Sequence, residues 1–195
     1  MNAFKGTGVA LVTPFTDDLK IDFESLKRLI DHVVKGGVDY LVVLGTTGEA
    51  ATLTTEEKKQ VLKACLEYNE GRVPVMLGIG GNNTQAVLKE IEDTDFYGVA
   101  AILSVSPYYN KPSQAGIIAH YTAIADAAPV PVIMYNIPGR TMSNMTASTT
   151  LKLSRHPNII GMKEASGNLE QCMQIAVLAA GFTPGEADAL RRAMA

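Results

Sequence analysis

The stretch Asp39-Tyr40-Leu41-Val42-Val43-Leu44 decides the fold, because it is short, apolar and β-branched and shows no alternation of polar and apolar residues. Runs of this kind are typical of strands buried on both faces, which occur in parallel sheets covered by helices. Five further runs share these properties and lie at residues 8–15, 73–78, 99–105, 131–135 and 159–163. Their starts follow one another at intervals of 26–34 residues, the length of one strand, one loop and one crossover helix. The sequence therefore predicts repeated βα units.

Amphipathic segments with helix-capping residues lie between these runs. Asp22 is placed to cap a helix that ends at Gly36-Gly37. Thr54, followed three residues later by Glu57, forms a capping-box pattern for a second helix. Further helices are predicted at residues 84–92, 114–127, 147–154 and 168–180, and a last helix at 183–195. Strands that alternate with helices in this way indicate an α/β fold.

The order of these elements fits either a barrel or an open doubly wound sheet. A Gly-rich phosphate turn straight after the first strand would favour the open sheet, but Thr13-Pro14-Phe15-Thr16 stands there instead. We therefore predict an α/β fold of the (β/α)8 TIM-barrel type, with an open sheet that binds a small keto acid as the alternative. Such barrels take about 250 residues, whereas this chain has 195. We expect an incomplete barrel of about six βα units, two C-terminal helices, and unpaired edges on the first and sixth strands.

The composition is that of one soluble, slightly acidic globular domain, with 47% hydrophobic and 19% charged residues and a net charge of -3. Lys and Arg do not cluster, so neither a nucleic acid nor a membrane surface is an expected partner. No apolar stretch approaches the roughly 18 residues of a membrane span, and residues 1–15 do not resemble a targeting segment. Cys65 and Cys172 form neither a CxxC pair nor a disulfide framework, which suits a reducing cytoplasm. Small-molecule ligands are therefore expected.

Lys163 is the first candidate for chemistry, because active sites of parallel α/β barrels lie at the carboxyl ends of the strands and Lys163 ends the sixth run. The apolar residues 159–162 before it would keep part of the amine uncharged and nucleophilic toward a carbonyl group. A lysine at a strand end also commonly extends its amine into water, and position alone favours that second interpretation. The hypothesis of an imine-forming lysine therefore depends on the residues around it.

Tyr135 and a pair of threonines end two other strands. Tyr135 follows the apolar residues 131–134, where its phenol would move protons to and from an imine or would simply fill the barrel mouth. Thr46 and Thr47 lie between two glycines, in a loop whose backbone N–H groups would hold a carboxylate while the hydroxyls relay protons. A plain glycine turn is the alternative, although such a turn does not require two adjacent hydroxyls.

Arg140 and the Tyr108-Tyr109 pair complete the candidates. Arg140 would bind a carboxylate as a bidentate fork, or it would be a solvated loop arginine. Tyr108 and Tyr109 follow a proline at a loop tip, where contact with a second subunit is as plausible as contact with a ligand. The histidines show no metal-ligand spacing, so we predict no metal site and interpret His32, His120 and His156, together with Cys65, as structural.

Four segments together closely resemble the dihydrodipicolinate synthase family, in order and in spacing, over residues 1 to about 175. They are Gly45-Thr46-Thr47-Gly48-Glu49, Ser106-Pro107-Tyr108-Tyr109-Asn110-Lys111-Pro112, Tyr135-Asn136-Ile137-Pro138-Gly139-Arg140-Thr141 and Gly161-Met162-Lys163-Glu164-Ala165-Ser166-Gly167. The resemblance implies a class I aldolase-like (β/α)8 barrel. It also implies a lyase that condenses pyruvate with aspartate semialdehyde to 4-hydroxy-tetrahydrodipicolinate, on the route to diaminopimelate and lysine.

The resemblance also implies a role for each candidate residue. Lys163 would form the imine with pyruvate, so that no other cofactor is needed, and Tyr135 would be the general acid and base. Thr46 and Tyr109 would join Tyr135 in a proton relay. The substrate carboxylates would be bound by Thr47 for pyruvate and by Arg140 for the semialdehyde.

Tyr109 has a further implication for assembly. In the family the matching tyrosine reaches into the active site of the neighbouring subunit, so a homo-oligomer, dimer or tetramer, is expected. N-acetylneuraminate lyase and the keto-deoxy-sugar acid aldolases resemble the chain in the lysine and the tyrosine. The paired threonines and the arginine after Tyr-Asn-Ile-Pro favour the synthase over these related lyases.

Residues 176–195 depart from the resemblance. Family members continue after the sixth strand with two more βα units, whereas residues 181–194 resemble a segment of bacterial DNA polymerase III α-type chains, from which no polymerase function follows. We expect a partial barrel at residues 1–175, truncated after the sixth unit, and a helical tail at 176–195. Three hypotheses stay open: an active synthase, a catalytically inactive barrel fragment that self-associates through its open sheet edges, or a related pyruvate aldolase such as N-acetylneuraminate lyase.

Overall fold

The structure, a computed structural model, describes residues 4–181 and contains one sheet of six strands. The strands follow the order β1-β2-β3-β4-β5-β6, and every neighbouring pair is parallel. They are β1 Gly8–Ala10, β2 Tyr40–Val43, β3 Val75–Gly78, β4 Ala101–Val105, β5 Val132–Asn136 and β6 Ile159–Glu164. A strand is present at each of the six predicted positions, and at least one helix lies in each connection between consecutive strands.

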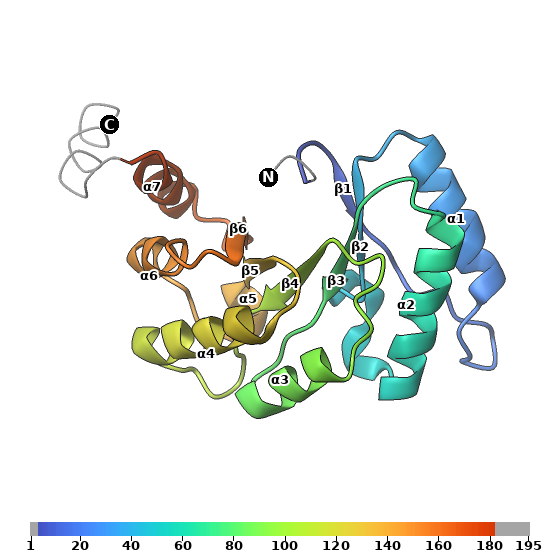
Figure 1. The fold of residues 1–195 in the computed structure, drawn as a ribbon, viewed down its shortest axis with the longest axis horizontal. Coiled ribbons are helices and arrows are strands. Elements are labelled where there is room, and N and C mark those ends of the chain that lie inside the picture. Colours follow the sequence, from blue (N-terminus) through green and yellow to red (C-terminus); the bar gives the residue numbers. More distant parts are fainter. Residues whose placement is uncertain (1–3, 182–195) are drawn as a thin grey trace.

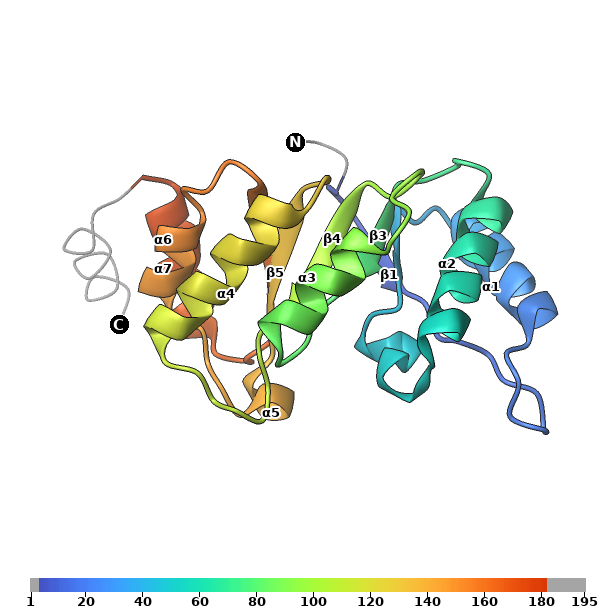
Figure 2. The ribbon, with the colours of Figure 1, turned by 60° about the horizontal axis from the view of Figure 1, so that its bottom comes forward.

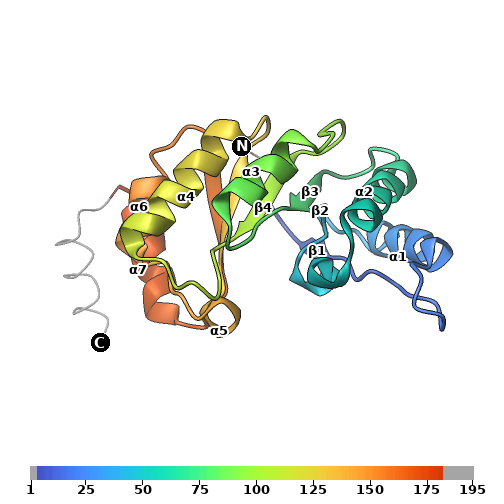
Figure 3. The same cartoon turned by 90° about the horizontal axis from the view of Figure 1, so that it is seen from below.

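The longer helices form an arc around the outside of the curled sheet (Figures 1 and 3). They are α1 Phe23–Lys35, α2 Thr55–Asn69, α3 Thr84–Glu92, α4 Gln114–Ala127, α6 Ala147–Leu153 and α7 Leu169–Ala179. Within this layer α1 packs on α2, α3 on α4, α4 on α6 and α6 on α7. This arrangement is an incomplete barrel of the TIM type, as the sequence predicts.

The main core lies between the sheet and the helices. Strand residues such as Leu41 and Ile102 are fully buried there against helix residues such as Ile117. A second, smaller cluster covers the inner face of the sheet and consists of Val42, Met76, Ala101, Leu103 and Tyr135. Successive side chains of a strand point to opposite faces of the sheet, and the strands contribute residues to a core on each face. Because both faces are buried, apolar residues follow one another along each strand without alternating with polar ones.

The sheet does not close into a complete barrel, because β1 and β6 each pair with a single neighbour among the described strands. The predicted unpaired edges are therefore present. The inner face surrounds a cavity of about 400 Å3 to which every strand contributes, with Gly8, Tyr40, Met76, Leu103, Ile133 and Lys163 among the lining residues.

The two predicted helix caps are present. The Asp22 carboxylate accepts a hydrogen bond from Ser25 N at 2.9 Å and caps α1. At the start of α2, Thr54 N donates to Glu57 Oε2 at 2.8 Å and Glu57 N donates to Thr54 Oγ1 at 3.2 Å. Caps of this kind satisfy backbone N–H groups that a helix leaves unpaired, and each contributes about 1 kcal/mol to stability.

The first strand is shorter than predicted, because it ends at Ala10 instead of continuing to Phe15. Leu11 N still donates to Val42 O at 3.0 Å, but the chain then leaves the sheet. Pro14 has no N–H with which to continue the ladder, and Phe15 forms an antiparallel bridge with Ile21.

Three short helices are absent from the sequence prediction. They are the 3-10 turns η1 Thr46–Gly48 and η2 Ala50–Thr52, and the four-residue helix α5 Pro138–Thr141. Elements of one turn are too short for a hydrophobic period to reveal. All three follow the carboxyl end of a strand, either β2 or β5, where a functional site is expected.

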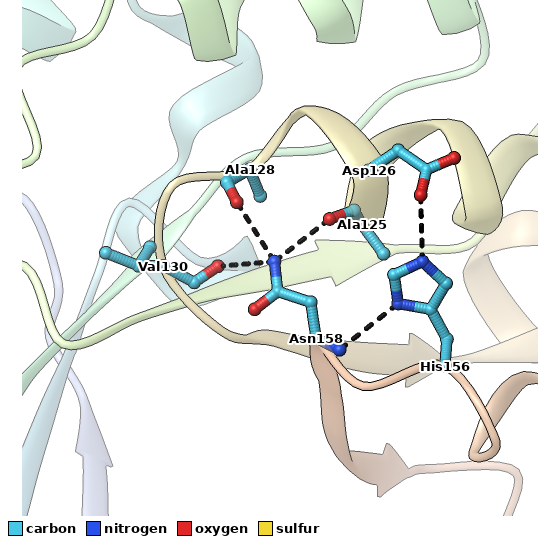
Figure 4. A network of polar contacts seen from close by, with 6 residues as sticks. All are labelled: Ala125, Asp126, Ala128, Val130, His156 and Asn158. Atoms are coloured by element: carbon cyan, nitrogen blue, oxygen red, sulfur yellow. Dashed lines mark hydrogen bonds and ion pairs between the residues drawn. The ribbon is translucent and has the colours of Figure 1, made fainter.

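The opposite, amino end of β6 is held by Asn158 (Figure 4). Its Nδ2 donates to three backbone carbonyl oxygens at and beyond the end of α4, at 2.9, 2.9 and 3.3 Å. Beside it, His156 Nε2 lies 3.0 Å from Asp126 Oδ1, and His156 Nδ1 accepts from Asn158 N at 3.2 Å. These contacts join α4 to the start of β6.

The remaining predictions concern membrane spans and the C-terminal part of the chain. No helix within residues 4–181 is long and apolar enough to cross a membrane. The predicted domain boundary between residues 175 and 176 falls inside α7 and stays a prediction. The predicted last helix at 183–195 lies outside the described residues.

Candidate active site

Tyr135 and Lys163 lie side by side at the carboxyl ends of β5 and β6. They are register partners in the parallel ladder, and Lys163 Nζ lies 4.4 Å from the centroid of the Tyr135 ring. A cation at this distance is attracted by the electron-rich face of the ring. Only 5% of Tyr135 is exposed, so its ring is a fixed platform. Two candidates chosen from different strands are therefore in contact.

The pleat of the sheet decides which way these side chains point. Tyr135 belongs to the inner apolar cluster and Lys163 lines the inner cavity. The residues that follow them, Asn136 and Glu164, point to the other face, where Glu164 accepts a hydrogen bond from Gln171 of α7. The reactive candidates thus share the inner face, and the polar residues behind them share the helix side.

Tyr121 of α4 fixes the backbone behind Tyr135. Its buried hydroxyl donates to Ser104 O at 2.8 Å and accepts from Tyr135 N at 3.4 Å, so it bridges β4 and β5. Burial raises the pKa of Tyr121 well above its ordinary value, which keeps the hydroxyl protonated as a donor. The sequence offers only an apolar helix position here and no signal of this bridging role.

Lys163 is exposed and lines the inner cavity. Of the two interpretations that the sequence leaves open, this placement agrees with an amine that extends into water, and the role of Lys163 in imine formation stays a prediction. Within residues 4–181, Lys163 is also absent from the ion pairs of the structure. The amine is therefore accessible to a small molecule.

Thr46 and Thr47 form η1, the turn that follows β2, and both are exposed. The turn is anchored from behind, because the buried Thr13 hydroxyl donates to Gly48 O at 2.7 Å. Glu49 then adopts the left-handed conformation with a φ of 53°. The predicted glycine loop is thus a structured turn that presents two hydroxyls to solvent.

Arg140 and Tyr109 follow β5 and β4, and both are exposed. Arg140 lies on α5, at the same edge of the sheet as the other strand ends (Figure 2). Tyr109 is 86% exposed and has a φ of 69°, and Tyr108 beside it is 41% exposed. Because the strands are parallel, all six candidates lie at one edge of the sheet. Among the described residues, side-chain contact between candidates is recorded for Tyr135 and Lys163.

A polar network that the sequence analysis did not find lies behind this pair. The Glu164 carboxylate accepts from Ser166 N at 2.7 Å, from Asn136 Nδ2 at 3.0 and 3.2 Å, and from Gln171 Nε2 at 2.8 Å. Burial raises the pKa of Glu164, but the hydrogen bonds from Ser166, Asn136 and Gln171 outweigh burial and hold it below its ordinary value. The carboxylate is therefore charged and fully engaged at neutral pH.

The same network reaches the loop before α6. Asn136 Nδ2 also donates to Asn144 Oδ1 at 2.8 Å, and Asn136 Oδ1 accepts from Met145 N at 3.0 Å. Asn144 Nδ2 donates in turn to Gln171 Oε1 at 2.8 Å. The sequence carries one usable signal: Asn136 and Glu164 each follow a candidate residue at a strand end, where the pleat turns them to the opposite face.

Cys65 and His120 are buried, as the structural interpretation of both requires. Burial raises the pKa of the Cys65 thiol to about 12 and lowers the pKa of His120 to about 4. His120 Nδ1 lies 2.8 Å from Thr84 Oγ1, in the contact between α4 and α3. Within residues 4–181, no group of three His, Cys, Asp or Glu side chains is placed to hold a metal ion.

Comparison with known proteins assigns the chain to a family. Residues 3–182 match the model of the dihydrodipicolinate synthetase family. The chain belongs to this family. The resemblance carried by the four motifs therefore extends over the whole described part of the chain.

Similar proteins share both the sequence and the fold of this member of the dihydrodipicolinate synthetase family. The 4-hydroxy-tetrahydrodipicolinate synthase of Flavobacterium psychrophilum is 54% identical over 176 residues, which are 90% of this chain and 60% of that protein. The dihydrodipicolinate synthase of Thermotoga maritima is 36% identical, with a TM-score of 0.88 over 92% of this chain and 61% of the other. The chloride-inhibited enzyme of Acinetobacter baumannii, solved in complex with pyruvate, is 39% identical, with a TM-score of 0.86 over 90% and 60%. The chain thus spans about 60% of the length of these relatives.

Proposed function

We propose that this member of the dihydrodipicolinate synthetase family is a lyase that condenses pyruvate with aspartate semialdehyde to 4-hydroxy-tetrahydrodipicolinate, for the synthesis of diaminopimelate and lysine. The observation that carries the proposal is the contact of Lys163 Nζ with the Tyr135 ring at the carboxyl edge of the sheet. Imine chemistry needs an amine that bonds to the carbonyl carbon and a nearby group that transfers protons. An accessible lysine beside a tyrosine supplies both.

The reaction begins when Lys163 Nζ attacks the keto carbon of pyruvate to form a carbinolamine, which loses water to give the imine. Loss of a proton from the methyl carbon gives an enamine, and this carbon attacks the aldehyde carbon of the semialdehyde, whose oxygen takes up a proton to become the hydroxyl group of the product. The amino group of the semialdehyde then attacks the imine carbon, and the bond to Lys163 Nζ breaks as the ring closes, which releases the lysine amine. Tyr135 is proposed to transfer the protons, in a relay with Thr46 and Tyr109.

The substrate carboxylates are assigned to Thr47 and Arg140. Thr47 is proposed to bind the pyruvate carboxylate, since its hydroxyl is exposed on the η1 turn. Arg140 is proposed to bind the carboxylate of the semialdehyde as a bidentate fork, which adds geometric specificity to charge. The covalent imine replaces any separate cofactor in this proposal.

The proposal includes a homo-oligomer, dimer or tetramer, and a location in the cytoplasm. The exposure of Tyr109 at its loop tip supports contact with a second copy, because a large aromatic side chain in full contact with water favours burial. The cytoplasmic location rests on the cysteine pattern of the sequence. The proposed partners are the two small-molecule substrates, and neither a nucleic acid nor a membrane is proposed as a partner.

The unpaired edges of β1 and β6 favour a second candidate function. Exposed strand edges present a row of free backbone donors and acceptors, so they tend to pair with another chain. The second candidate is a catalytically inactive barrel fragment that self-associates through these edges. Because the chain spans about 60% of its relatives, both candidates require a direct test.

The experiment that separates them is the reduction of a trapped imine. The chain is incubated with pyruvate, reduced with borohydride and weighed as intact protein, beside the Lys163→Ala variant and with light scattering on both. A mass gain of one reduced pyruvyl group in the parent alone supports the lyase, and a condensation assay with aspartate semialdehyde follows. A folded, self-associated parent without the adduct supports the inactive fragment and contradicts the lyase.

A further inference from the structure

We propose that Glu164 is a positioning residue, whose carboxylate fixes the carboxyl ends of β5 and β6 and thereby holds Lys163 against Tyr135. The inference rests on the proposed function, because it names what orients the lysine of that site. Glu164 itself faces the helix side of the sheet and acts through the backbone that it shares with Lys163.

The first step of the argument is the register of the two strands. Tyr135 pairs with Lys163, and one residue further Asn136 pairs with Glu164. The bonds from Asn136 Nδ2 to the Glu164 carboxylate, at 3.0 and 3.2 Å, therefore cross the strands directly behind the reactive pair. Each reactive residue directly precedes a member of this cross-strand pair in the sequence. A rotation of either strand end would break the pair behind it.

The second step is the attachment of this pair to the rest of the fold. Gln171 of α7 donates to Glu164 at 2.8 Å, and Ser166 N donates to it at 2.7 Å in the loop between β6 and α7. On the other strand, Met145 N donates to the buried Asn136 at 3.0 Å. The two strand ends are thus fixed to α7 and to the loop before α6, not only to each other.

The third step is the chemistry of the acceptor. The partners of the Glu164 carboxylate are all donors, namely amide N–H groups and the Ser166 hydroxyl, and an ionised carboxylate is the side chain that offers acceptors alone. Glutamine has nearly the same shape, but its NH2 group would face the donors Asn136 and Gln171. The substitution Glu164→Gln therefore breaks the network with little change in volume. This variant tests the charge pattern and not the packing.

The exposure of the Lys163 side chain explains why its backbone must be held in place by Glu164. Within residues 4–181 the Lys163 side chain is exposed and lies beside a cavity of the unclosed sheet, and the Tyr135 ring is the contact that the structure shows for its amine. A long, exposed lysine loses considerable rotamer freedom when it is held in one place. The orientation of its backbone is then the main factor that directs the amine to the ring.

The experiment reads the position of Lys163 without depending on activity. Lysines are labelled with 13C at Cε, the Lys163 signal is assigned with Lys163→Arg, and the spectrum is recorded for the parent and for Glu164→Gln. Because Nζ lies 4.4 Å from the ring centroid, the ring current shifts the Lys163 ε-methylene signal upfield in the parent. Glu170→Gln, which removes an exposed carboxylate of α7, is the matched control.

The proposal predicts that the Lys163 signal moves to the position of an exposed lysine in Glu164→Gln and stays in place in Glu170→Gln. It also predicts a first-order rate of imine trapping lowered about tenfold, whereas a purely structural role would lower the amplitude and leave the rate unchanged. An unchanged Lys163 signal in folded Glu164→Gln overturns the proposal. Should this variant not fold, Glu164→Asp gives the same reading, with a partial shift expected and an unchanged signal contradicting it. A parent that shows the upfield signal but traps no pyruvate refutes the proposed function alone.

Discussion

The two ends of the strands use the left-handed backbone conformation differently. At the amino edge, five glycines lie at positive φ, with Glu70 as the one other residue there: Gly6, Gly37, Gly71, Gly98 and Gly181. At the carboxyl edge, Gly167 is the glycine at positive φ, and six residues with side chains adopt it as well: Leu19, Leu44, Glu49, Tyr109, Lys111 and Met142. This contrast holds for residues 4–181, the part that the structure describes.

The difference shows where the chain accepts backbone strain. Glycine reaches the left-handed region without a steric penalty, whereas another residue costs roughly 1–2 kcal/mol. The glycines at the amino edge therefore form turns there without a steric cost. The same edge is stabilised by the hydrogen bonds that Asn158 donates. Strained residues of this kind cluster at functional sites, where the side chain or its direction is needed. The carboxyl edge carries the strain together with every candidate residue.

The largest effect is expected for Tyr135→Phe at the carboxyl edge. The ring stays and the hydroxyl is lost, so the fold and the Lys163 contact persist while proton transfer is removed. General acid and base catalysis contributes about 100-fold to 10,000-fold, so the rate of imine trapping should fall by about this factor. Stopped-flow mixing with pyruvate and borohydride quenching measures this rate. A rate within twofold of the parent would exclude Tyr135 as the proton-transfer group.

The next largest effect is expected for Asn158→Ala at the amino edge. The change leaves three carbonyl oxygens without their donor, so the free energy of unfolding should decrease by about 1–3 kcal/mol. Urea denaturation followed by circular dichroism measures the change, and the trapping rate per folded molecule should not differ from the parent. Asp126→Ala is the comparison, because it removes the contact of an exposed carboxylate with the His156 ring and should cost less than about 1 kcal/mol. Equal costs for the two variants would contradict this account of the amino edge.

A smaller effect distinguishes the two edges in acid. The hydrogen bonds of Glu164 lower its pKa in the folded state, so its contribution to stability is present above its ordinary pKa of 4.5 and is lost as the pH falls through the folded value. Protection of the Ala165 amide, which donates to Asn136 O at 2.8 Å, should therefore decrease as the pH falls below 4.5, as measured by hydrogen exchange corrected for intrinsic rates. The Val132 amide, which donates to Asn158 O at 2.8 Å, should keep its protection. An equal loss of hydrogen-exchange protection at the Ala165 and Val132 amides would refute the local role of Glu164.

The smallest effects are expected from exchanging the two kinds of left-handed residue. Gly37→Ala introduces a side chain where φ is 85°, with free space around it, so the cost is purely conformational and about 1 kcal/mol. Glu49→Gly relieves strain at a φ of 53° and should raise the free energy of unfolding by up to about 1 kcal/mol. Urea midpoints measure both changes. A destabilised Glu49→Gly would mean that the carboxyl edge is not strained at this residue.

Much of the fold follows from the sequence, because apolar periods and helix caps are local properties. The run at residues 39–44 and its five equivalents give all six strands, and Asp22 and Thr54 give the starts of two helices. The end of β1 does not follow from the apolar pattern, because the pattern continues past the residue at which the chain leaves the sheet. The one-turn helix α5 does not follow either, because a single turn is too short to show a helical period.

The candidate site is predictable to a different extent. Residues at strand ends can be read from the sequence, and Lys163 and Tyr135 indeed meet. The sequence leaves open whether the apolar strand withdraws the Lys163 amine from water or the amine extends into water, and the exposed side chain is seen only in the folded chain. The network of Asn136, Glu164 and Gln171 does not follow from the sequence, since its members come from three separate elements and only the register brings them together.

The most direct test of the central claim locates the reduced adduct within the sequence. The chain is treated with pyruvate and borohydride, digested, and its lysine peptides are quantified by mass spectrometry, so that Lys163 is compared with exposed lysines such as Lys35 and Lys59. The account predicts the reduced pyruvyl group on Lys163 alone, at a level that Tyr135→Phe lowers. Label spread evenly over the exposed lysines, or absent from Lys163 in the folded protein, would contradict the claim that the carboxyl edge is an imine-forming site.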